Sequence, residues 1–324
     1  MEITERGSGS GGIIARLVPA ATPRHKPAMP DRASRIARTL DAGEHALRAA
    51  SRVIIDLVLP PRCAVCSAIV SDDGGFCTTC WQSLTFLSGP ACAQCAMPFG
   101  REQGAGALCG ACIADPPPFA RVHVPLAYGA QSRRVVMRLK YGRRTGMARL
   151  MARMMVRMMT ASLSQPVAVP ADPPLPLTSP LPLPPLPPVL VPVPLHRWRL
   201  WSRGFNQSAE VARHLGRLTG IAIVVDALVR HRQTPVLRGM GRAARARAVR
   251  GVFAVPGNRR AAIAGRTIFL VDDVFTTGST TAACARTLLR AGAARVEVVA
   301  FARVVVDTPD DIDTPHDTPG GGDH

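Results

Sequence analysis

The chain has 324 residues, which is enough for about two domains of ordinary size. Its apolar fraction of 47% is typical of a globular protein, and no stretch reaches the ~18 consecutive apolar residues that a membrane helix needs. Glu2 and Glu5 lie where a signal peptide would have a basic start, so we expect a cytoplasmic protein with no membrane span. The net charge of +18 comes almost entirely from arginine, which indicates either a genome-wide compositional bias or partners that carry phosphate.

The N-terminal part is predicted to contain a single helix. Residues 1–31 are rich in glycine, proline and charge without periodicity, which is typical of disorder. Residues 32–61 carry apolar side chains at roughly helical spacing, and Pro60 and Pro61 end this predicted helix.

Residues 62–115 hold eight of the nine cysteines, in four Cys-x-x-Cys pairs. Two such pairs can direct four thiolates at one tetrahedral zinc ion. A disulfide framework is disfavoured because nothing indicates export. Redox catalysis would need a single pair at the start of a helix in a thioredoxin-like unit, which four pairs in a row do not fit. We therefore predict structural zinc in one or two sites, from consecutive or interleaved pairs, with the ligands Cys63, Cys66, Cys77, Cys80, Cys92, Cys95, Cys109 and Cys112. The ninth cysteine, Cys284, is expected to be a buried small apolar residue.

A second domain is predicted over residues 120–303. A short strand at 122–128 precedes helical segments over 132–162, where Met147, Leu150, Met151, Met154 and Met155 recur at helical spacing. Such a methionine stripe is more typical of core packing than of a binding surface. The Pro-rich stretch 165–188 interrupts the domain, either as a loop insertion or as a ligand for a Pro-recognising partner.

Strands and helices alternate after this insertion, which is typical of an α/β domain with a mostly parallel sheet. Predicted strands are 189–193, 221–225, 267–271 and 296–301, and predicted helices are 206–219 and 279–291, each ended by a glycine. The segment 230–250 is basic and aperiodic. The acidic tail 306–324 is rich in proline and glycine and is predicted to be disordered.

The most informative segment is 267–280. Its strand leads into Asp272 and Asp273, and a hydroxyl-rich loop then opens a helix. A helix N-terminus offers free N–H groups and partial positive charge to a phosphate, and Gly278 allows close backbone approach. The carboxylates suit ribose hydroxyls, or magnesium shared with a pyrophosphate. The segment therefore predicts a sugar-phosphate ligand, held by the loop residues Thr276, Thr277, Gly278, Ser279 and Thr280. No P-loop motif occurs, so a P-loop ATPase is not supported.

The segment 268–280 resembles the phosphoribosyl-pyrophosphate signature of type I phosphoribosyltransferases. The chain over about 46–303 resembles the ComF family, also called the competence-protein F or GntX-like family. The other stretches that carry the resemblance are Pro60–Cys63 before the paired cysteines, Arg138–Gly142, Val191–His196 with Arg203–Gln207, and Arg247–Phe253. The resemblance implies an α/β domain of the type I phosphoribosyltransferase kind, with a mostly parallel sheet, behind an N-terminal double zinc ribbon.

The resemblance also implies roles for single residues. Asp272 and Asp273 would bind the ribose diol and help to place magnesium, and Arg203 would contact pyrophosphate. His196 and Asn206 would lie near the pyrophosphate, although a buried, hydrogen-bonded His196 fits the sequence equally well. The five loop residues would hold the 5′-phosphate. The chain departs from the family pattern at Ala248, where the family has Asn, and lacks an evident Gln after Thr234–Pro235. Both departures lie in the flexible loop, so the resemblance supports ligand binding more firmly than turnover.

Two classes of function follow from this resemblance. One is a phosphoribosyltransferase, a glycosyltransferase in which a nitrogen base displaces pyrophosphate while the loop 230–250 closes over the site. The other is a non-catalytic competence factor that handles single-stranded DNA or binds a protein such as a competence helicase, with phosphoribosyl pyrophosphate as a regulatory ligand. Both imply a role in natural competence and DNA uptake. The aromatic content of 4% is low for a protein that stacks on bases.

Overall fold

A computed structural model describes residues 60–71, 74–142, 146–163, 186–232, 244 and 247–305. The chain divides into two units after Leu59, and all described residues belong to the second. Several predicted features lie wholly or mostly outside the described residues. They are the predicted disorder at 1–31, nearly all of the predicted helix 32–61, most of the Pro-rich stretch 165–188 and the tail 306–324. Within the described part, no helix is both long and apolar enough to cross a membrane.

The cysteine-rich part contains two similar small modules. Each has a short helix that begins directly after a cysteine, α2 (Thr78–Gln82) after Cys77 and α3 (Gly110–Ala114) after Cys109. Each also has an antiparallel bridge beside its first cysteine pair, Arg62 to Ile69 and Ala91 to Pro98. We call these modules ribbon 1 (residues 60–84) and ribbon 2 (residues 90–115).

The main sheet has six strands, all paired in parallel. They are β1 (Arg121–His123), β2 (Leu126–Ala127), β3 (Leu186–Pro192), β4 (Ala222–Ile223), β7 (Arg266–Phe275) and β8 (Arg295–Arg303). Their order is β1-β8-β7-β3-β4, and β2 also pairs with β8. The predicted strand 122–128 is thus two short strands on the same neighbour. The prediction of a mostly parallel sheet is confirmed.

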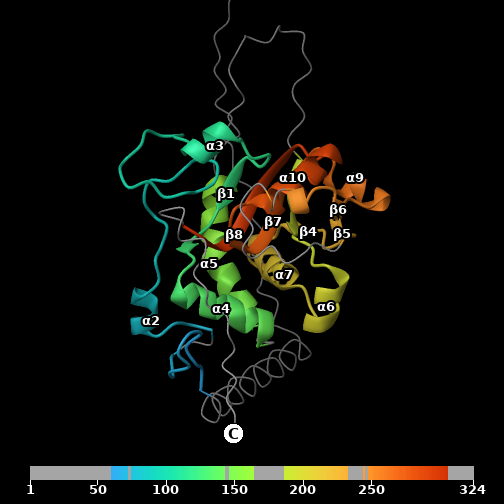
Figure 1. The fold of residues 1–324 in the computed structure, drawn as a ribbon. Helices are drawn as coiled ribbons and strands as arrows, with labels where there is room; N and C mark the ends of the chain where they lie inside the picture. Colours follow the sequence, from blue (N-terminus) through green and yellow to red (C-terminus); the bar gives the residue numbers. More distant parts are fainter. Residues whose placement is uncertain are drawn as a thin grey trace, which may run out of the picture. The chain divides into compact units, whose positions relative to one another are not determined.

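Helices cover both faces of this sheet (Figure 1). The longer ones are α4 (Ala130–Tyr141), α5 (Gly146–Leu163), α7 (Gln207–Thr219) and α10 (Ser279–Arg290). The sequence did not predict the short elements, which are α6 (Arg197–Arg203), η1 (Gly257–Arg259), α9 (Arg260–Ile263) and the antiparallel pair β5 (Val229–Arg230) and β6 (Phe253–Ala254). The predicted helical region 132–162 is two helices.

Helix α7 shows why the local prediction was correct. Asn206 precedes it, and its side-chain oxygen accepts a hydrogen bond from the N–H of Ser208 at 3.0 Å. Gly220 ends the helix with φ 74°, a left-handed conformation that glycine adopts without steric cost. Both signals are local, so they can be read from neighbouring residues.

Alternation along β7 divides the core into two layers. Phe269 and Val271 pack with α4, α5, α7 and part of ribbon 1, while Ile268 and Leu270 pack with α10, α9 and Phe253 of β6. Successive side chains of a strand point to opposite faces, which produces this division. The methionine stripe of α5 belongs to the first layer and Cys284 to the second, so both predictions of core packing are confirmed.

Candidate functional site

Two adjacent carboxylates lie near the carboxyl end of β7. The strand continues to Phe275, four residues beyond its predicted end, so Asp272 and Asp273 lie within the paired strand and not after it. The side chain of Asp273 is buried and forms an ion pair with Lys140 at 2.5 Å. Asp272 accepts hydrogen bonds from the Ser208 hydroxyl at 3.3 Å and from the N–H of Asp273 at 2.9 Å.

The charges of this group depend on one another. Burial and the neighbouring Asp273 raise the pKa of Asp272 to about 8, against the opposing effects of the Asp273 N–H and Lys140. Burial alone would lower the pKa of Lys140, but the attraction of Asp273 and Asp272 outweighs it and raises that pKa. The ligand-free group therefore holds a lysine cation beside one carboxylate, with a second carboxyl that releases its proton at higher pH.

The loop after β7 forms the uncapped start of α10. Gly278 precedes the helix with φ 76°, and no side chain caps the helix there. Both α6 and α7, by contrast, are capped by the side chains of His196 and Asn206. The first N–H groups of α10 have no partner within the helix, which suits an anion. The loop hydroxyls lie around them, with Thr277 and Ser279 oxygens 3.0 Å apart.

Phe275 forms the floor of this loop. A Cβ atom added at Gly278 would lie 2.8 Å from the Phe275 ring, so only glycine fits here without displacement. Thr276 is exposed and Thr277 half-buried, while Ser279 is buried at the helix start. The structure thus brings together all five residues that the sequence predicted for phosphate binding.

The residues predicted near pyrophosphate occupy the segment between β3 and α7. His196 is buried, and its Nδ1 accepts from the N–H of Trp198 at 3.4 Å, so it is a helix cap. Asn206 is also engaged, because its amide donates to the Val193 carbonyl at 3.0 Å in addition to capping α7. Arg203 donates to Gln207 at 3.2 Å and to the Tyr141 hydroxyl at 3.3 Å, which holds its guanidinium beside the end of α4.

The segment Arg138–Gly142 at the end of α4 links these parts. Arg138 donates to the Ala64 carbonyl at 2.9 Å and to the Ser67 hydroxyl at 3.0 Å, which fixes α4 to ribbon 1. Two residues later Lys140 pairs with Asp273, and Tyr141 then contacts Arg203. The sequence predicted no role for Lys140, Tyr141 or Ser208. The resemblance marked the first two as part of a motif, whereas no signal marked Ser208.

The eight paired cysteines form two separate clusters. One consists of Cys63, Cys66, Cys77 and Cys80, the other of Cys92, Cys95, Cys109 and Cys112, and the sulfurs of each lie within 4.8 Å of one another. The Cys66–Cys77 and Cys95–Cys109 sulfurs are 3.6 Å apart, close to the ~3.8 Å that tetrahedral Zn–S bonds of ~2.3 Å require. The pairs are therefore consecutive and not interleaved, and the four-sulfur donor sets fit structural zinc.

Backbone donors prepare each cluster for a thiolate. Burial alone would raise the pKa of Cys63, but N–H groups, including those of Val65 and Cys77, lower it to about 6. In the other cluster the Cys109 N–H donates to Cys92 at 3.3 Å, and backbone donors lower the pKa of Cys92 to about 7. Burial and neighbouring thiols raise the pKa of another cysteine in each ribbon, that of Cys80 to about 12 and that of Cys112 well above its ordinary value. Each ribbon thus has one cysteine that loses its proton easily and one that gives it up only to a bound metal ion.

Known proteins resemble both parts of the chain. A model of the double zinc ribbon domain matches residues 54–113, and a model of the phosphoribosyl transferase domain matches residues 201–318. DNA utilization protein YhgH of Salmonella typhi is 30% identical over 250 residues, which are 77% of this chain and 100% of that protein. YhgH of Escherichia coli (strain K12) is 29% identical over the same shares. Competence protein F of Haemophilus influenzae is 31% identical over 114 residues, 35% of this chain and 49% of that protein.

Proposed function

The chain belongs to the ComF family, which includes competence protein F and YhgH, and we propose that it binds phosphoribosyl pyrophosphate with magnesium at the loop after β7. The observation that supports this most is the uncapped start of α10, one short loop after a strand that carries two adjacent carboxylates near its end. The names of the relatives, DNA utilization protein and competence protein, support a role in DNA utilization and competence.

The α10 start would hold the 5′-phosphate. Backbone N–H groups after Gly278 would donate to the anion, and the hydroxyls of Thr277, Ser279 and Thr280 would add donors around it. The Phe275 ring lies so close to Gly278 that a side chain at this position would collide with it. No charged side chain is needed for this contact, which explains why the loop contains only hydroxyl residues and glycine.

The carboxylates would hold the ribose hydroxyls and the magnesium ion. Carboxylate oxygens are the ligands that magnesium prefers, so Asp272 and Asp273 fit the metal chemically. The Lys140 side chain keeps 22% of its surface exposed and Asp273 only 7%, so magnesium would reach Asp273 where the lysine moves aside. Since the pKa of Asp272 is raised to about 8, binding of a cation there removes its proton. Affinity for the magnesium complex should therefore rise with pH up to about 8.

The proposed reaction is a group transfer at the anomeric carbon. The bond from this carbon to the pyrophosphate oxygen breaks, and pyrophosphate leaves with the electron pair. A bond forms from a nitrogen nucleophile, which loses its proton. Because the transition state resembles an oxocarbenium ion, positioning and charge stabilisation carry the catalysis. Arg203, which bonds to Tyr141 and lies near Lys140, would stabilise the negative charge of the leaving group.

Calorimetric titration with phosphoribosyl pyrophosphate and magnesium tests this function. We expect saturable binding to the parent protein, and no binding to an Asp272→Asn/Asp273→Asn variant at ligand concentrations that saturate the parent. Asp226→Asn is the matched control, because this acid is exposed and pairs with Arg259 away from the loop. Circular dichroism must show that all variants are folded. Absence of binding to the folded parent would refute the proposal.

A separate assay tests turnover. The parent protein is incubated with phosphoribosyl pyrophosphate, magnesium and a panel of nitrogen bases, and pyrophosphate is measured. Release that depends on a base and on the two acids supports transfer. Tight binding without release would refute transfer while leaving the ligand site intact, as for a protein that uses the compound as a regulatory ligand.

A further inference from the structure

Helix α6 exposes aromatic surface to an unusual degree. None of its residues is buried, and Trp198 and Trp201 are 56% and 82% exposed. They are two of only three tryptophans in the chain. Tryptophan is normally largely buried, so two exposed rings on one short helix indicate a binding surface for a partner molecule.

The third tryptophan shows the contrast. Trp81 in ribbon 1 packs against Phe76 and Phe86, with ring centroids 6.0 and 4.9 Å away. Trp198 and Trp201 instead meet edge to face, with centroids 6.4 Å apart and planes at 88°. Perpendicular rings form no parallel slot between them. Trp201 is 82% exposed, so most of its ring surface is open to solvent, where a flat partner can stack.

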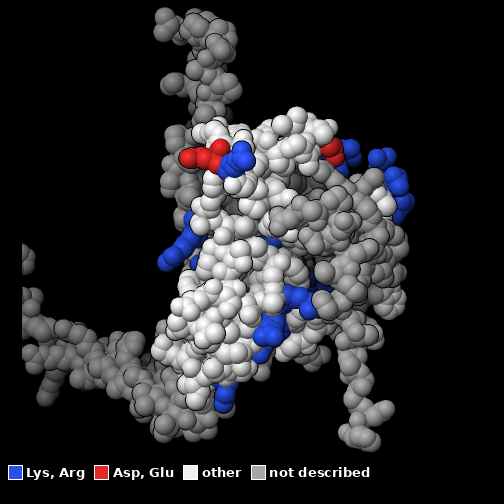
Figure 2. All heavy atoms as spheres, turned by 60° about the vertical axis from the view of Figure 1, so that its left-hand side comes forward, with Lys and Arg blue, Asp and Glu red and all other residues white. Residues whose placement is uncertain are grey.

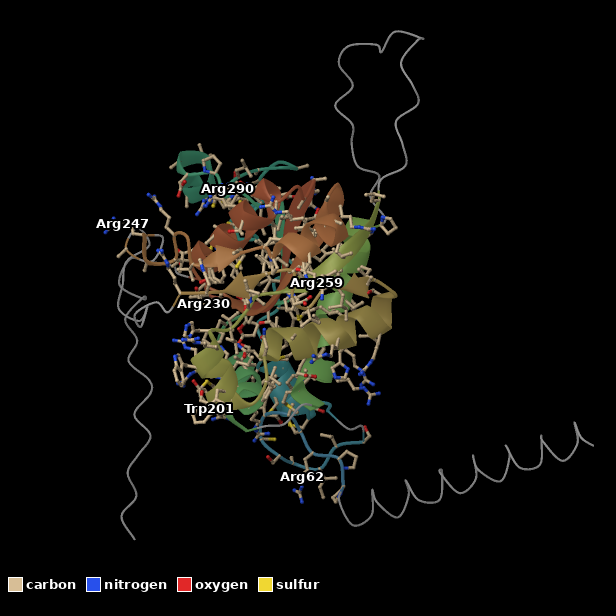
Figure 3. All side chains as sticks on the ribbon, turned by 90° about the vertical axis from the view of Figure 1, so that its right-hand side faces the viewer. Arg62, Trp201, Arg230, Arg247, Arg259 and Arg290 are labelled. Carbon is tan, nitrogen blue, oxygen red and sulfur yellow. The ribbon has the colours of Figure 1, made fainter. Side chains whose placement is uncertain are left out.

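Positive charge surrounds these rings. Arg197, Arg199 and Arg203 lie on the same helix, which contains no acidic residue. The Arg197 guanidinium lies 5.8 Å from the centre of Trp198, and Arg203 lies 5.1 Å from the centre of the exposed ring of Tyr141. We call Tyr141, Arg197, Trp198, Arg199, Trp201 and Arg203 the α6 surface, and Figure 3 shows where Trp201 lies on it.

The arrangement favours nucleic acid over a membrane. A helix turns about 100° per residue, so Trp198 and Trp201 share a face while Leu200 lies about 100° or more away from both. The apolar residues thus do not form the single broad face that a membrane-surface helix needs. Stacking faces beside arginines instead match a base and its phosphates, through ring stacking, cation–π contacts and ion pairing.

Charge alone would not have located this surface. In Figure 2 the lysine and arginine side chains of one face lie in several separate groups, with acidic side chains near the top. Aromatic content also gave no indication, since it is only 4% of the chain. The informative observation is that exposed tryptophan and arginine coincide on one helix.

We propose that the α6 surface binds single-stranded nucleic acid, with an unpaired base stacked on Trp201 and the phosphates held by the arginines. Duplex bases are already stacked on their neighbours, so their faces are not available to the ring. The inference does not depend on sugar-phosphate binding at α10. A bound strand would nevertheless pass close to that site, because Arg203 and Tyr141 adjoin Lys140.

The test uses the full zinc-loaded chain and a fluorescein-labelled oligothymidine of about 16 nucleotides. We expect Trp201→Ala to weaken binding by about 5- to 150-fold, the equivalent of one stacked base, and Trp201→Phe to recover most of the loss. Arg199→Gln should lower the slope of log affinity against log salt by about 0.7. Arg290→Gln, which removes the same charge from the end of α10, should leave both quantities unchanged (Figure 3).

Intrinsic fluorescence gives a second readout. Oligothymidine should quench the parent protein but not a Trp198→Phe/Trp201→Phe variant, in which Trp81 is the only tryptophan left. The proposal is overturned if Trp201→Ala binds as the parent does, if a duplex binds as tightly as the single strand, or if thymidine monophosphate competes as strongly as the oligonucleotide. Titration of Trp201→Ala with phosphoribosyl pyrophosphate separates the two proposals, because that affinity should be unchanged.

Discussion

The guanidinium of Arg303 lies over the ring of Phe275, 5.2 Å from its centre. The same buried side chain donates to the Cys95 carbonyl and contacts the Met97 sulfur at 3.4 Å. Phe275 in turn supports the loop at Gly278. One side chain at the end of β8 therefore connects ribbon 2 to the candidate phosphate site.

Replacement of Arg303 should test this connection. Arg303→Met keeps an apolar stem of similar length but removes the hydrogen bond to the Cys95 carbonyl and the cation–π contact with Phe275. Each of these interactions contributes about 1–3 kcal/mol to stability. We expect the free energy of unfolding to fall by about 2–4 kcal/mol and the affinity for phosphoribosyl pyrophosphate to fall with it. Urea denaturation and calorimetry measure the two effects. An unchanged affinity in the folded variant would show that ribbon 2 does not support the loop.

The ion pair of Lys140 and Asp273 should behave as a coupled unit. Lys140→Met leaves a buried carboxylate without its partner, and we expect a loss of about 2–3 kcal/mol in unfolding free energy. The loss stays below that of a fully buried pair because the lysine side chain is 22% exposed. Lys140→Met/Asp273→Asn should recover most of it. A double-mutant cycle in urea checks this, and additive losses would contradict the coupling.

Gly278 should not tolerate even alanine. Its φ of 76° strains an alanine by about 1–2 kcal/mol, and the new Cβ would meet the Phe275 ring. Gly278→Ala should lower both stability and sugar-phosphate affinity, whereas Gly257→Ala, with nothing within 4 Å of the added atom, is the control. Gly278→Ala/Phe275→Leu should recover the part of the loss that comes from the clash. Full tolerance of alanine would argue against the loop conformation.

Glu297 should make stability depend on acid pH. Burial opposes its ionisation, but hydrogen bonds from His123 at 2.6 Å and Arg295 at 2.7 Å lower its pKa to about 2. Because this folded-state pKa is below the ordinary 4.5, the unfolded chain binds the proton first as pH falls. At pH values above 4.5, ionised Glu297 should contribute about 3 kcal/mol to the free energy of unfolding. This contribution should be lost as the pH falls from 4.5 to 2.

Urea unfolding of the parent protein and Glu297→Gln at pH 7, 4 and 3 measures this loss. The difference between the two proteins should shrink as pH falls, and Glu102→Gln, at an exposed position of ribbon 2, should show no such trend. The comparison between variants isolates Glu297 because acid release of zinc affects all of them alike. A constant difference across the pH range would contradict the assignment.

Zinc content should be two ions per chain. Native mass spectrometry or elemental analysis should find two in the parent protein and one in Cys66→Ser, because each cluster has its own four sulfurs. A variant that loses both ions at once would indicate that the two ribbons are not independent. A parent protein with a single ion would contradict the consecutive pairing.

Much of the fold was predictable because its signals are local. The caps of α7, the methionine stripe of α5 and the apolar runs of β3, β7 and β8 depend on residues within a few positions of one another. The cysteine pairs and the loop at Gly278 are equally local, since spacing alone aims two sulfurs or several N–H groups at one point. From these signals came the prediction of an α/β domain, the zinc ligands and the phosphate loop.

Contacts between distant segments could not be read in this way. Lys140 meets Asp273, Ser208 meets Asp272, and Arg303 meets Cys95 because the chain returns to the same edge of the parallel sheet. The exposure of Trp198 and Trp201 likewise depends on what the rest of the chain leaves uncovered. Spacing in a sequence sets which side chains share a turn or a strand face, but partners across the fold depend on the order of the strands, which no local pattern encodes.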